Sequence, residues 1–354
     1  MAKREYYDIS NLISTNANWL MLLGKRANGK SYQVKMACLT DAYENDVDFV
    51  YLRRYSEDIK QYAVTSYFED MPISKITKRK YNGVKAYQGN IYFVNVKDGK
   101  EKDKKKIGRY CSLNSAIRYK SQTFPNVRNI IYEEFITDEM YLDDEPRKLQ
   151  QFVSTVFRLE RGRVFLVGNT LSRVCPYFNE WCLDGVLKQK QGTIEIYHYH
   201  TDNGHGEETV IDIAVEQCAN THNENTMFFG DASKQIVTGQ WDVKEVPKLP
   251  RLSYEYEIVY EILIEYQTFK FVLQLLVEPV NGGLLCYVYP YTKKREIYRK
   301  ITDVFSDLPN VTSKLDVTIR PENLIKKCLM LDKVCYSDNL TGSDFKKVIA
   351  KLKV

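Results

Sequence analysis

The sequence lacks long hydrophobic runs, paired cysteine motifs and a strong excess of charge. No apolar stretch approaches the roughly 18 residues that a membrane-spanning helix needs, and the opening MAKREYYDIS contains no signal-peptide core. We therefore expect a soluble, intracellular protein. The eight cysteines form no CxxC pair, so we expect buried, reduced thiols in place of a disulfide framework.

Length and composition are sufficient for more than one folded domain. The chain has 354 residues, of which 44% are hydrophobic, and it includes 27 tyrosines and 15 phenylalanines. That content supports sizeable cores, and the length favours two domains with a small connector. The net charge of +5 is mild, so a polyanionic partner would have to bind at local basic patches. The densest patch is KDGKEKDKKKIGR, residues 97–109.

The first half of the chain alternates apolar strand patterns with helical patterns. Continuous apolar runs bounded by polar residues or glycine are typical of buried parallel strands. The expected strands are 18–24, 48–55, 126–135 and 163–169, and the expected helices are 31–40 and 146–157. A hairpin is expected over 83–96. This alternation predicts an α/β domain with a mainly parallel sheet over residues 1–187.

The sequence pattern changes near residue 188. Residues 188–240 are polar and contain loop signals such as HTDNGHG, so we expect a small connector there. Residues 241–354 predict mainly strands, followed by helices that begin near Pro321 and Ser343. The first of these strand segments also fits a helical period, through Glu257, Glu261 and Glu265.

A phosphate-binding motif lies between the first expected strand and the first expected helix. Residues 24–31, GKRANGKS, match the pattern GxxxxGK[ST] in full. In this pattern the loop amides and the helix N-terminus bind phosphates, the lysine reaches the β- and γ-phosphates, and the hydroxyl binds Mg²⁺. The alternative is a glycine loop that matches by chance. The expected nucleotide-binding residues are Gly24, Lys25, Arg26, Ala27, Asn28, Gly29, Lys30, Ser31 and Tyr32, with Ser31 also a metal ligand.

Two adjacent glutamates end the expected strand at 126–135. We expect Glu133 to hold the Mg²⁺ shell and Glu134 to orient or deprotonate the attacking water. Such a base favours hydrolysis over a metabolite kinase, whose acceptor comes from a substrate. The alternative is a pair of solvated carboxylates at a strand end. Asn169 ends the next strand, where an amide can either sense the γ-phosphate or begin a turn.

Six segments, taken in order, carry a resemblance to a known family. LLGKRANGKSY, FVYLRRY, PNVRNIIYEEF, STVFR, FLVGN and CPYFNEW resemble the genome-packaging ATPases of small podophages, of the phi-twenty-nine type. The likeness is strongest over residues 15–182 and covers most of the chain. It implies a P-loop NTPase domain of the ASCE type, then the connector, then an α+β domain that is RNase H-like, a vestigial nuclease. One departure is Glu133, where the family usually has an aspartate.

The resemblance also implies a homomeric ring, by family a pentamer, with ATP bound at each subunit boundary. A neighbouring subunit's arginine would complete the site. Arg158 stands at the matching position, and Arg161 and Arg163 are close by in sequence. Lys120 matches a second basic position that acts across the boundary. For each of these residues a solvated surface charge is the alternative interpretation.

A ring that translocates DNA must hold phosphates without reading bases. Lys104, Lys105 and Lys106 lie in what we expect to be a loop-like insert of the first domain, and Lys60 follows the strand that carries Arg53. We expect DNA contacts at these four lysines. A solvated charge run is the alternative.

Candidate metal sites outside the phosphate loop have unfavourable spacing. A two-metal nuclease needs carboxylates that converge from separate elements, whereas Glu255, Glu257, Glu261 and Glu265 lie in one segment. We therefore expect the terminal domain to dock and to contact DNA without cutting it. The histidines fall in the expected connector and match no common zinc pattern. They are His198, His200, His205 and His222.

These patterns and the resemblance predict an ATP-driven motor that translocates double-stranded viral DNA into a preformed procapsid. The expected cofactors are ATP and Mg²⁺. The expected partners are DNA, the procapsid portal or connector, and further copies of the chain; the need for a packaging RNA stays open, and no membrane is involved. The expected location is the host cytoplasm, with transient docking on the procapsid. Two other classes stay open: a nuclease-competent large terminase, and a non-motor P-loop NTPase or kinase.

Overall fold

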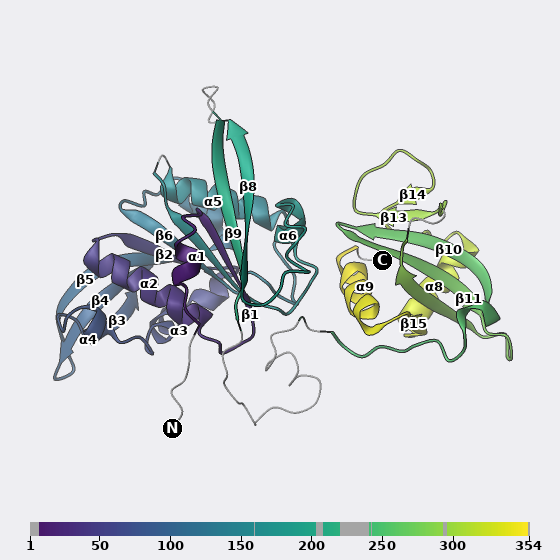
Figure 1. Cartoon of the computed structure of the whole chain (residues 1–354), viewed down its shortest axis with the longest axis horizontal. Helices are drawn as coiled ribbons and strands as arrows, with labels where there is room; N and C mark the ends of the chain where they lie inside the picture. The colour runs from purple at the N-terminus through teal and green to yellow at the C-terminus, as the bar shows by residue number, and fades with distance from the viewer. Residues whose placement is uncertain are drawn as a thin grey trace. The chain divides into compact units, whose positions relative to one another are not determined.

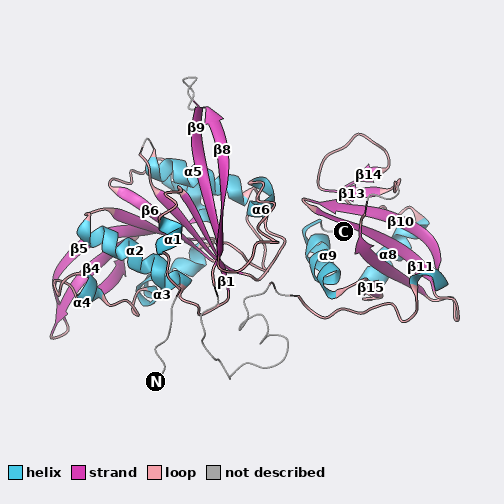
Figure 2. Ribbon diagram, in the orientation of Figure 1, coloured by secondary structure: helices cyan, strands magenta, loops and turns pink. Residues whose placement is uncertain are grey.

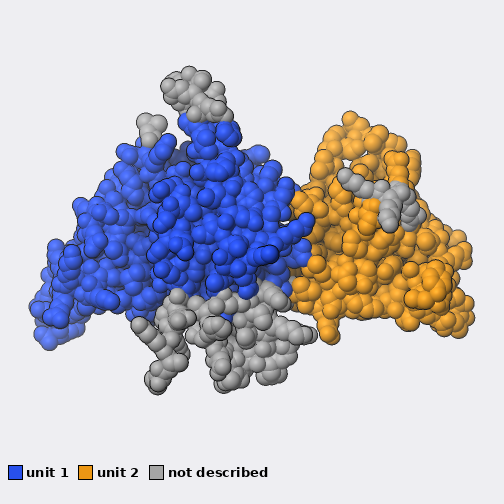
Figure 3. Space-filling model, viewed as in Figure 1, with its two compact units in different colours: residues 1–241 blue, residues 242–354 orange. Residues whose placement is uncertain are grey.

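The chain forms two compact units, residues 1–241 and 242–354, coloured separately in Figure 3. The computed structural model describes residues 7–158, 160–202, 208–219, 241, 243–292 and 296–352. Within these residues no helix is long and apolar enough to cross a membrane. Each unit is described by itself.

Unit 1 is built on one large sheet, whose strands fan out in Figures 1 and 2. Its order within the described residues is β3-β4-β5-β2-β6-β7-β1-β9-β8. The bounds are β1 (Trp19–Gly24), β2 (Asp48–Arg53), β3 (Gly83–Tyr87), β4 (Asn90–Lys97), β5 (Lys100–Ser112), β6 (Val127–Glu133), β7 (Arg163–Asn169), β8 (Thr193–Asp202) and β9 (Glu208–Gln217).

The centre of this sheet is parallel from β5 through β2, β6, β7 and β1 to β9. All six strands therefore end at the same side of the sheet. We call that side the carboxyl edge, where β1 and β7 finish together at the paired residues Gly24 and Asn169. The opposite side, where β2 begins at Asp48 and β7 begins at Arg163, is the amino edge. Ligands of open parallel sheets bind at the carboxyl edge.

Helices cover both faces of this sheet, which explains why β1, β2, β6 and β7 are largely apolar. Alternate residues of a strand point to opposite faces. Leu20 and Leu22 of β1 lie in the core that includes α2, whereas Met21 and Leu23 lie in the core that includes α5. The helices of unit 1 are α1 (Ser10–Ile13), α2 (Lys30–Glu44), η1 (Ser56–Ile59), α3 (Gln61–Tyr67), α4 (Ile73–Ile76), η2 (Leu113–Tyr119), α5 (Glu145–Phe157) and α6 (Pro176–Glu180).

Most of the expected elements of unit 1 are confirmed, and two expectations are wrong. The lysine run at 97–109 is not a loop-like insert, because it lies in the antiparallel pair β4–β5. The segment that we expected to open a connector instead adds the hairpin β8–β9 to the sheet, with β9 parallel to β1. Polar residues alternate with apolar ones along β8 because it is an edge strand. The resulting polar content is similar to that of a loop. Residues 220–240 of the expected connector lie outside the described part of the chain.

Unit 2 is a mixed six-stranded sheet with helices on it. The order within its described residues is β14-β13-β10-β11-β12-β15, with an antiparallel meander β10–β11–β12 and parallel pairing elsewhere. The glutamates whose spacing also fitted a helix lie on strand β10. The bounds are η3 (Ser253–Glu255), β10 (Glu257–Tyr266), β11 (Phe269–Val277), β12 (Leu284–Pro290), β13 (Lys300–Thr302), β14 (Val311–Thr312), α8 (Arg320–Met330), β15 (Val334–Tyr336) and α9 (Asn339–Leu352).

Candidate nucleotide site at the carboxyl edge

The loop from Gly24 to Ser31 connects β1 to α2 at the carboxyl edge. Gly29 caps α2 at φ 99°, a left-handed conformation that glycine adopts without strain. Within the loop, Lys25 and Asn28 are buried, and Arg26 and Ala27 are exposed. Tyr32 in the first turn of α2 packs against the core beneath. A loop that leads directly into a helix N-terminus presents backbone N–H groups to an anion.

Lys30 is the buried cation of this loop, with 4% of its surface exposed. Its Nζ donates to the carbonyl of Lys25 at 2.6 Å, and lies 3.3 Å from the Oδ1 atoms of Asn28 and Asn169. Burial lowers the pKa of Lys30 to about 8, because the ammonium loses hydration. A bound polyphosphate would favour the charged form. The structure thus brings Asn169, from the end of β7, to the same cation.

Glu133 ends β6 and is buried beside the loop. The Tyr67 hydroxyl donates to its Oε1 at 2.6 Å. Burial raises the pKa of Glu133, and hydrogen bonding by Tyr67 and then Ser31 opposes that rise. No local sequence pattern indicates Tyr67, which comes from α3.

Glu134 follows Glu133 but faces a different environment. Its backbone has φ 57°, which turns the chain out of β6, and its carboxylate side chain is 60% exposed. The Arg53 guanidinium donates to its Oε2 at 2.7 Å. In this conformation the candidate base is paired with an arginine of its own chain.

Arg54, next to Arg53, has a separate and structural role. It is buried and bonds both carboxylate oxygens of Glu145, at 2.8 and 3.0 Å. It also donates to the carbonyls of Glu134 and Phe135, at 3.1 and 2.7 Å. Breaking a buried pair of this kind costs about 3–5 kcal/mol, so Arg54 fixes the turn that carries Glu134.

The donor set at this edge fits Mg²⁺. A hydroxyl and a carboxylate are hard oxygen ligands, and Mg²⁺ is usually held by one or two such groups together with substrate phosphates and water. Ser31 and Glu133 supply them. Across the described residues, no group of three or more His, Cys, Asp or Glu side chains could form an all-protein metal cage. A site completed by nucleotide phosphates is therefore the arrangement that these residues suit.

Arg158 and Lys120 lie far from the loop of their own chain. Helix α5 begins at the carboxyl edge, where Glu145 bonds Arg54, and it ends at the amino edge with Arg158. The Arg158 guanidinium is exposed and donates to the carbonyl of Gln122 at 3.2 Å. Lys120, two residues before Gln122, is also exposed. A seven-residue strand such as β7 spans roughly 20 Å between the two edges.

The neighbouring arginines differ from Arg158 in their partners. Arg163 is half-buried and bonds Asp41 at 2.9 Å and Asn129 at 3.0 Å, which holds it within its own subunit. Arg161 is exposed. Of the two arginines with a defined contact, only Arg158 presents its guanidinium at an exposed position.

Two of the four lysines expected to contact DNA already pair with aspartates at the amino edge. Lys105 lies 2.5 Å from Asp46 and Lys106 lies 2.9 Å from Asp48. Lys104 approaches Glu101 only at 3.8 Å. Lys60 lies elsewhere, exposed between η1 and α3 on the carboxyl side.

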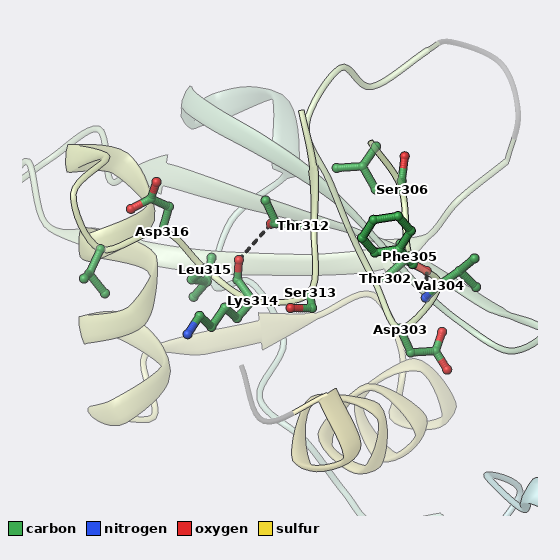
Figure 4. A pocket seen from close by; sticks show the side chains of 12 residues that line it. Thr302, Asp303, Val304, Phe305, Ser306, Thr312, Ser313, Lys314, Leu315 and Asp316 are labelled. Atoms are coloured by element: carbon green, nitrogen blue, oxygen red, sulfur yellow. Dashed lines mark hydrogen bonds between the residues drawn. The ribbon is translucent and has the colours of Figure 1, made fainter. Parts of the chain in front are cut away.

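In unit 2, two carboxylates of β10 have defined partners. Glu265 lies 2.7 Å from Lys270 and 3.0 Å from Lys300, and the Gln274 amide donates to Glu261. A cavity of about 600 Å³ lies between residues 302–306 and 311–317, where Phe305 is largely exposed (Figure 4). Its lining includes no arginine and Lys314 alone among lysines, so it does not suit a triphosphate.

We expect no zinc site at the histidines, and the described part of the chain covers only His198 and His200. His198 pairs with Asp212 across β8 and β9, Nδ1 to Oδ1, at 2.7 Å. His205 and His222 lie outside the described residues.

Comparisons with known proteins agree on one family. The model of the podovirus DNA encapsidation protein (Gp16) family matches residues 1–195. The DNA packaging protein of Bacillus phage phi29 is 28% identical over 182 residues, which are 50% of this chain and 50% of that protein. The DNA packaging protein of Bacillus phage B103 is 29% identical over 161 residues, 44% of this chain and 46% of that protein. The matched segment thus spans about half the length of these relatives.

Solved structures extend the similarity of fold to both units. The bacteriophage Phi-29 viral genome packaging motor assembly superposes with a TM-score of 0.57 at 21% identity, covering 98% of this chain and 99% of that one. The Phi-28 gp11 DNA packaging motor gives a TM-score of 0.53 at 17% identity, covering 99% of both chains.

Proposed function

The chain belongs to the podovirus DNA encapsidation protein family, and from this premise we propose that it hydrolyses ATP to drive double-stranded DNA into a procapsid. The observation that carries the proposal is the convergence of Lys30, Ser31 and Glu133 at one phosphate loop on the carboxyl edge, with Glu134 next in the chain. A solvated acid pair on a chance glycine loop would not place a buried lysine and a buried carboxylate side by side.

Each residue of this edge has a distinct part in the proposed reaction. The loop amides and Lys30 bind the β- and γ-phosphates, and Asn169 holds the Lys30 ammonium in place. Ser31 and Glu133 would hold Mg²⁺, which when bound neutralises charge on the phosphate oxygens. Glu134 accepts a proton from the attacking water. Since Arg53 occupies the Glu134 carboxylate, hydrolysis requires that this pair open.

The second catalytic cation is proposed to come from another copy of the chain. Arg158 lies at the amino edge, roughly 20 Å from its own loop, so it cannot reach the phosphate bound there. In a ring of identical subunits it would reach a neighbour's ATP, with Lys120 beside it. Hydrolysis would then depend on subunit contact, which allows firing to be ordered around the ring.

DNA and procapsid contacts complete the proposal. Lys60 and the lysines of β5 are proposed to contact DNA phosphates, with Lys105 and Lys106 limited by their aspartate partners. Unit 2 is proposed to dock on the procapsid portal as an RNase H relative that does not cut DNA. The mixed sheet and the lysine partners of Glu265 support this, because a two-metal nuclease needs carboxylates that are available to metal ions.

One experiment tests the proposal against its competitors. ATP hydrolysis would be measured in Mg²⁺ with and without double-stranded DNA, together with a pull-down on empty procapsids with and without ATP. We expect DNA-stimulated hydrolysis and ATP-dependent capture. ATP hydrolysis at the same rate with and without DNA would instead indicate a non-motor NTPase. Mg²⁺- or Mn²⁺-dependent cleavage of the DNA would indicate a nuclease-competent terminase.

A further inference from the structure

Tyr67 is the one side chain from outside the two sequence motifs whose hydrogen bond to Glu133 is defined in the described structure. Its hydroxyl donates to Oε1 of Glu133 at 2.6 Å, although the two residues are 66 positions apart in the chain. A tyrosine hydroxyl carries its proton at neutral pH, and a carboxylate oxygen accepts, so Tyr67 is the donor in this bond.

Several groups fix the Tyr67 ring in this position. The ring lies 4.5 Å from that of Tyr51 on β2, centroid to centroid, and 4.9 Å from that of Phe68. The Lys35 ammonium lies 4.6 Å above the ring and donates to the Tyr67 carbonyl at 2.7 Å. Lys35 belongs to α2, the helix that begins at the phosphate loop, and is itself paired with Asp70 at 2.5 Å. Thus α2, α3 and β2 together hold one hydroxyl against the end of β6.

A glutamate at the Glu133 position needs such a partner. Its carboxylate ends a flexible chain with three side-chain torsions, so holding it in one orientation costs conformational entropy. The Tyr67 hydroxyl occupies one carboxylate oxygen and thereby selects one orientation. The phosphate-loop motif assigns Ser31 to the same Mg²⁺. Groups that orient metal-binding carboxylates in this way are known to tune metal affinity.

We infer that Tyr67 is a positioning residue that orients the Glu133 carboxylate toward Mg²⁺ bound with the nucleotide. This inference rests on the proposed function, because it concerns the same site. It assigns to α3 a role that neither the phosphate-loop motif nor the acidic pair reveals.

The test is Tyr67→Phe, which keeps the ring and removes only the hydroxyl. Binding of a fluorescent ATP analogue would be titrated with Mg²⁺, and again in EDTA. We expect the half-saturating Mg²⁺ concentration to rise about tenfold while binding in EDTA stays unchanged. We also expect kcat to recover at high Mg²⁺, since excess metal offsets poor orientation but does not repair a misfolded core.

The matched control is Tyr81→Phe. Tyr81 is a buried tyrosine of the same core and stacks on Phe93, with ring centroids 5.6 Å apart. This variant also loses one buried tyrosine hydroxyl, but it should keep the wild-type Mg²⁺ titration. An unchanged titration in Tyr67→Phe, or an equal shift in both variants, would overturn the inference.

Two further outcomes are kept distinct. If Tyr67→Phe does not fold, Lys35→Met is tested in its place, because it removes the ammonium above the Tyr67 ring and leaves the hydroxyl. A higher half-saturating Mg²⁺ concentration in this variant supports the inference, and an unchanged one overturns it. If the wild-type chain itself shows no Mg²⁺-dependent ATP binding or hydrolysis, the proposed function fails, and the inference fails with it. If the wild-type chain binds and hydrolyses ATP in an Mg²⁺-dependent way and Tyr67→Phe has the same Mg²⁺ titration, only the inference about Tyr67 fails.

Discussion

At the carboxyl edge of the first sheet, Lys30 lies buried in a phosphate loop, whereas at the amino edge Lys105 and Lys106 each pair with an aspartate. Lys30 has 4% of its surface exposed, and burial brings its pKa to about 8. The side chains of Lys105 and Lys106 are 29% and 34% exposed, and their aspartates lie at 2.5 and 2.9 Å.

The difference between the two edges shows that a dense run of lysines in the sequence does not indicate where the candidate nucleotide site lies. Two lysines of the densest lysine run pair with aspartates at the amino edge, whereas Lys30 at the carboxyl edge is buried and has no carboxylate within ion-pair distance among the described residues. A buried cation without such a partner is costly, and it persists where an anionic ligand compensates for it. The following variants test this difference between the edges, beginning with the largest expected effect.

Lys30→Ala should abolish hydrolysis, with a loss in kcat of at least ~100-fold, because the β- and γ-phosphates lose a fixed cation. Lys106→Ala is the control at the amino edge and, assayed without DNA, should stay within about twofold of wild type, since a partly exposed pair contributes little. Steady-state ATPase assays compare the two. Equal losses of kcat in both variants would show that the two edges do not differ in their contribution to hydrolysis.

Glu134→Gln should bind ATP normally yet turn over ~100-fold more slowly, as a neutral amide cannot accept the proton from water. Glu160→Gln gives the same chemical change in a glutamate that pairs with Arg128 at 3.0 Å, and should leave turnover unchanged. Nucleotide binding and single-turnover hydrolysis separate the two steps. Near-normal turnover in Glu134→Gln would show that another residue activates the water.

The smallest effect is expected for DNA. Replacing Lys104, Lys105 and Lys106 together by alanine would lower the salt slope of DNA binding by about 2.7 if all three contacted phosphates. Because Lys105 and Lys106 already have carboxylate partners, we expect a change below about 1. Binding measured across salt concentrations decides between these values. A drop near the full value would mean that DNA displaces Asp46 and Asp48.

The carboxyl edge could be predicted from the sequence because its signals are local. The phosphate loop is eight consecutive residues, and Glu133 and Glu134 end an apolar strand whose burial follows from its composition. Parallel pairing then brings the ends of β1, β6 and β7 to one edge without further information.

The remaining features depend on contacts between distant residues. Tyr67 meets Glu133 across 66 positions and Arg54 meets Glu145 across 91, and no local periodicity reports either contact. The hairpin β8–β9 has the composition of a connector because the edge strand β8 has polar residues on its open face. The lysine run has the composition of a loop because charged residues are typical of exposed strands near a sheet edge.

The central claim is that the carboxyl edge of one subunit is completed by the amino edge of another, and mixed rings test it most directly. Arg158→Ala subunits keep an intact loop, and Lys30→Ala subunits keep an intact Arg158; each alone should hydrolyse ATP poorly, since such an arginine contributes ~10³- to 10⁵-fold. In rings shown to co-assemble at equal ratio, about a quarter of the interfaces would pair an intact loop with an intact arginine. We predict partial recovery of ATPase activity in that mixture. No recovery at any ratio would contradict the account, because it would mean that Arg158 does not act on a neighbour's ATP.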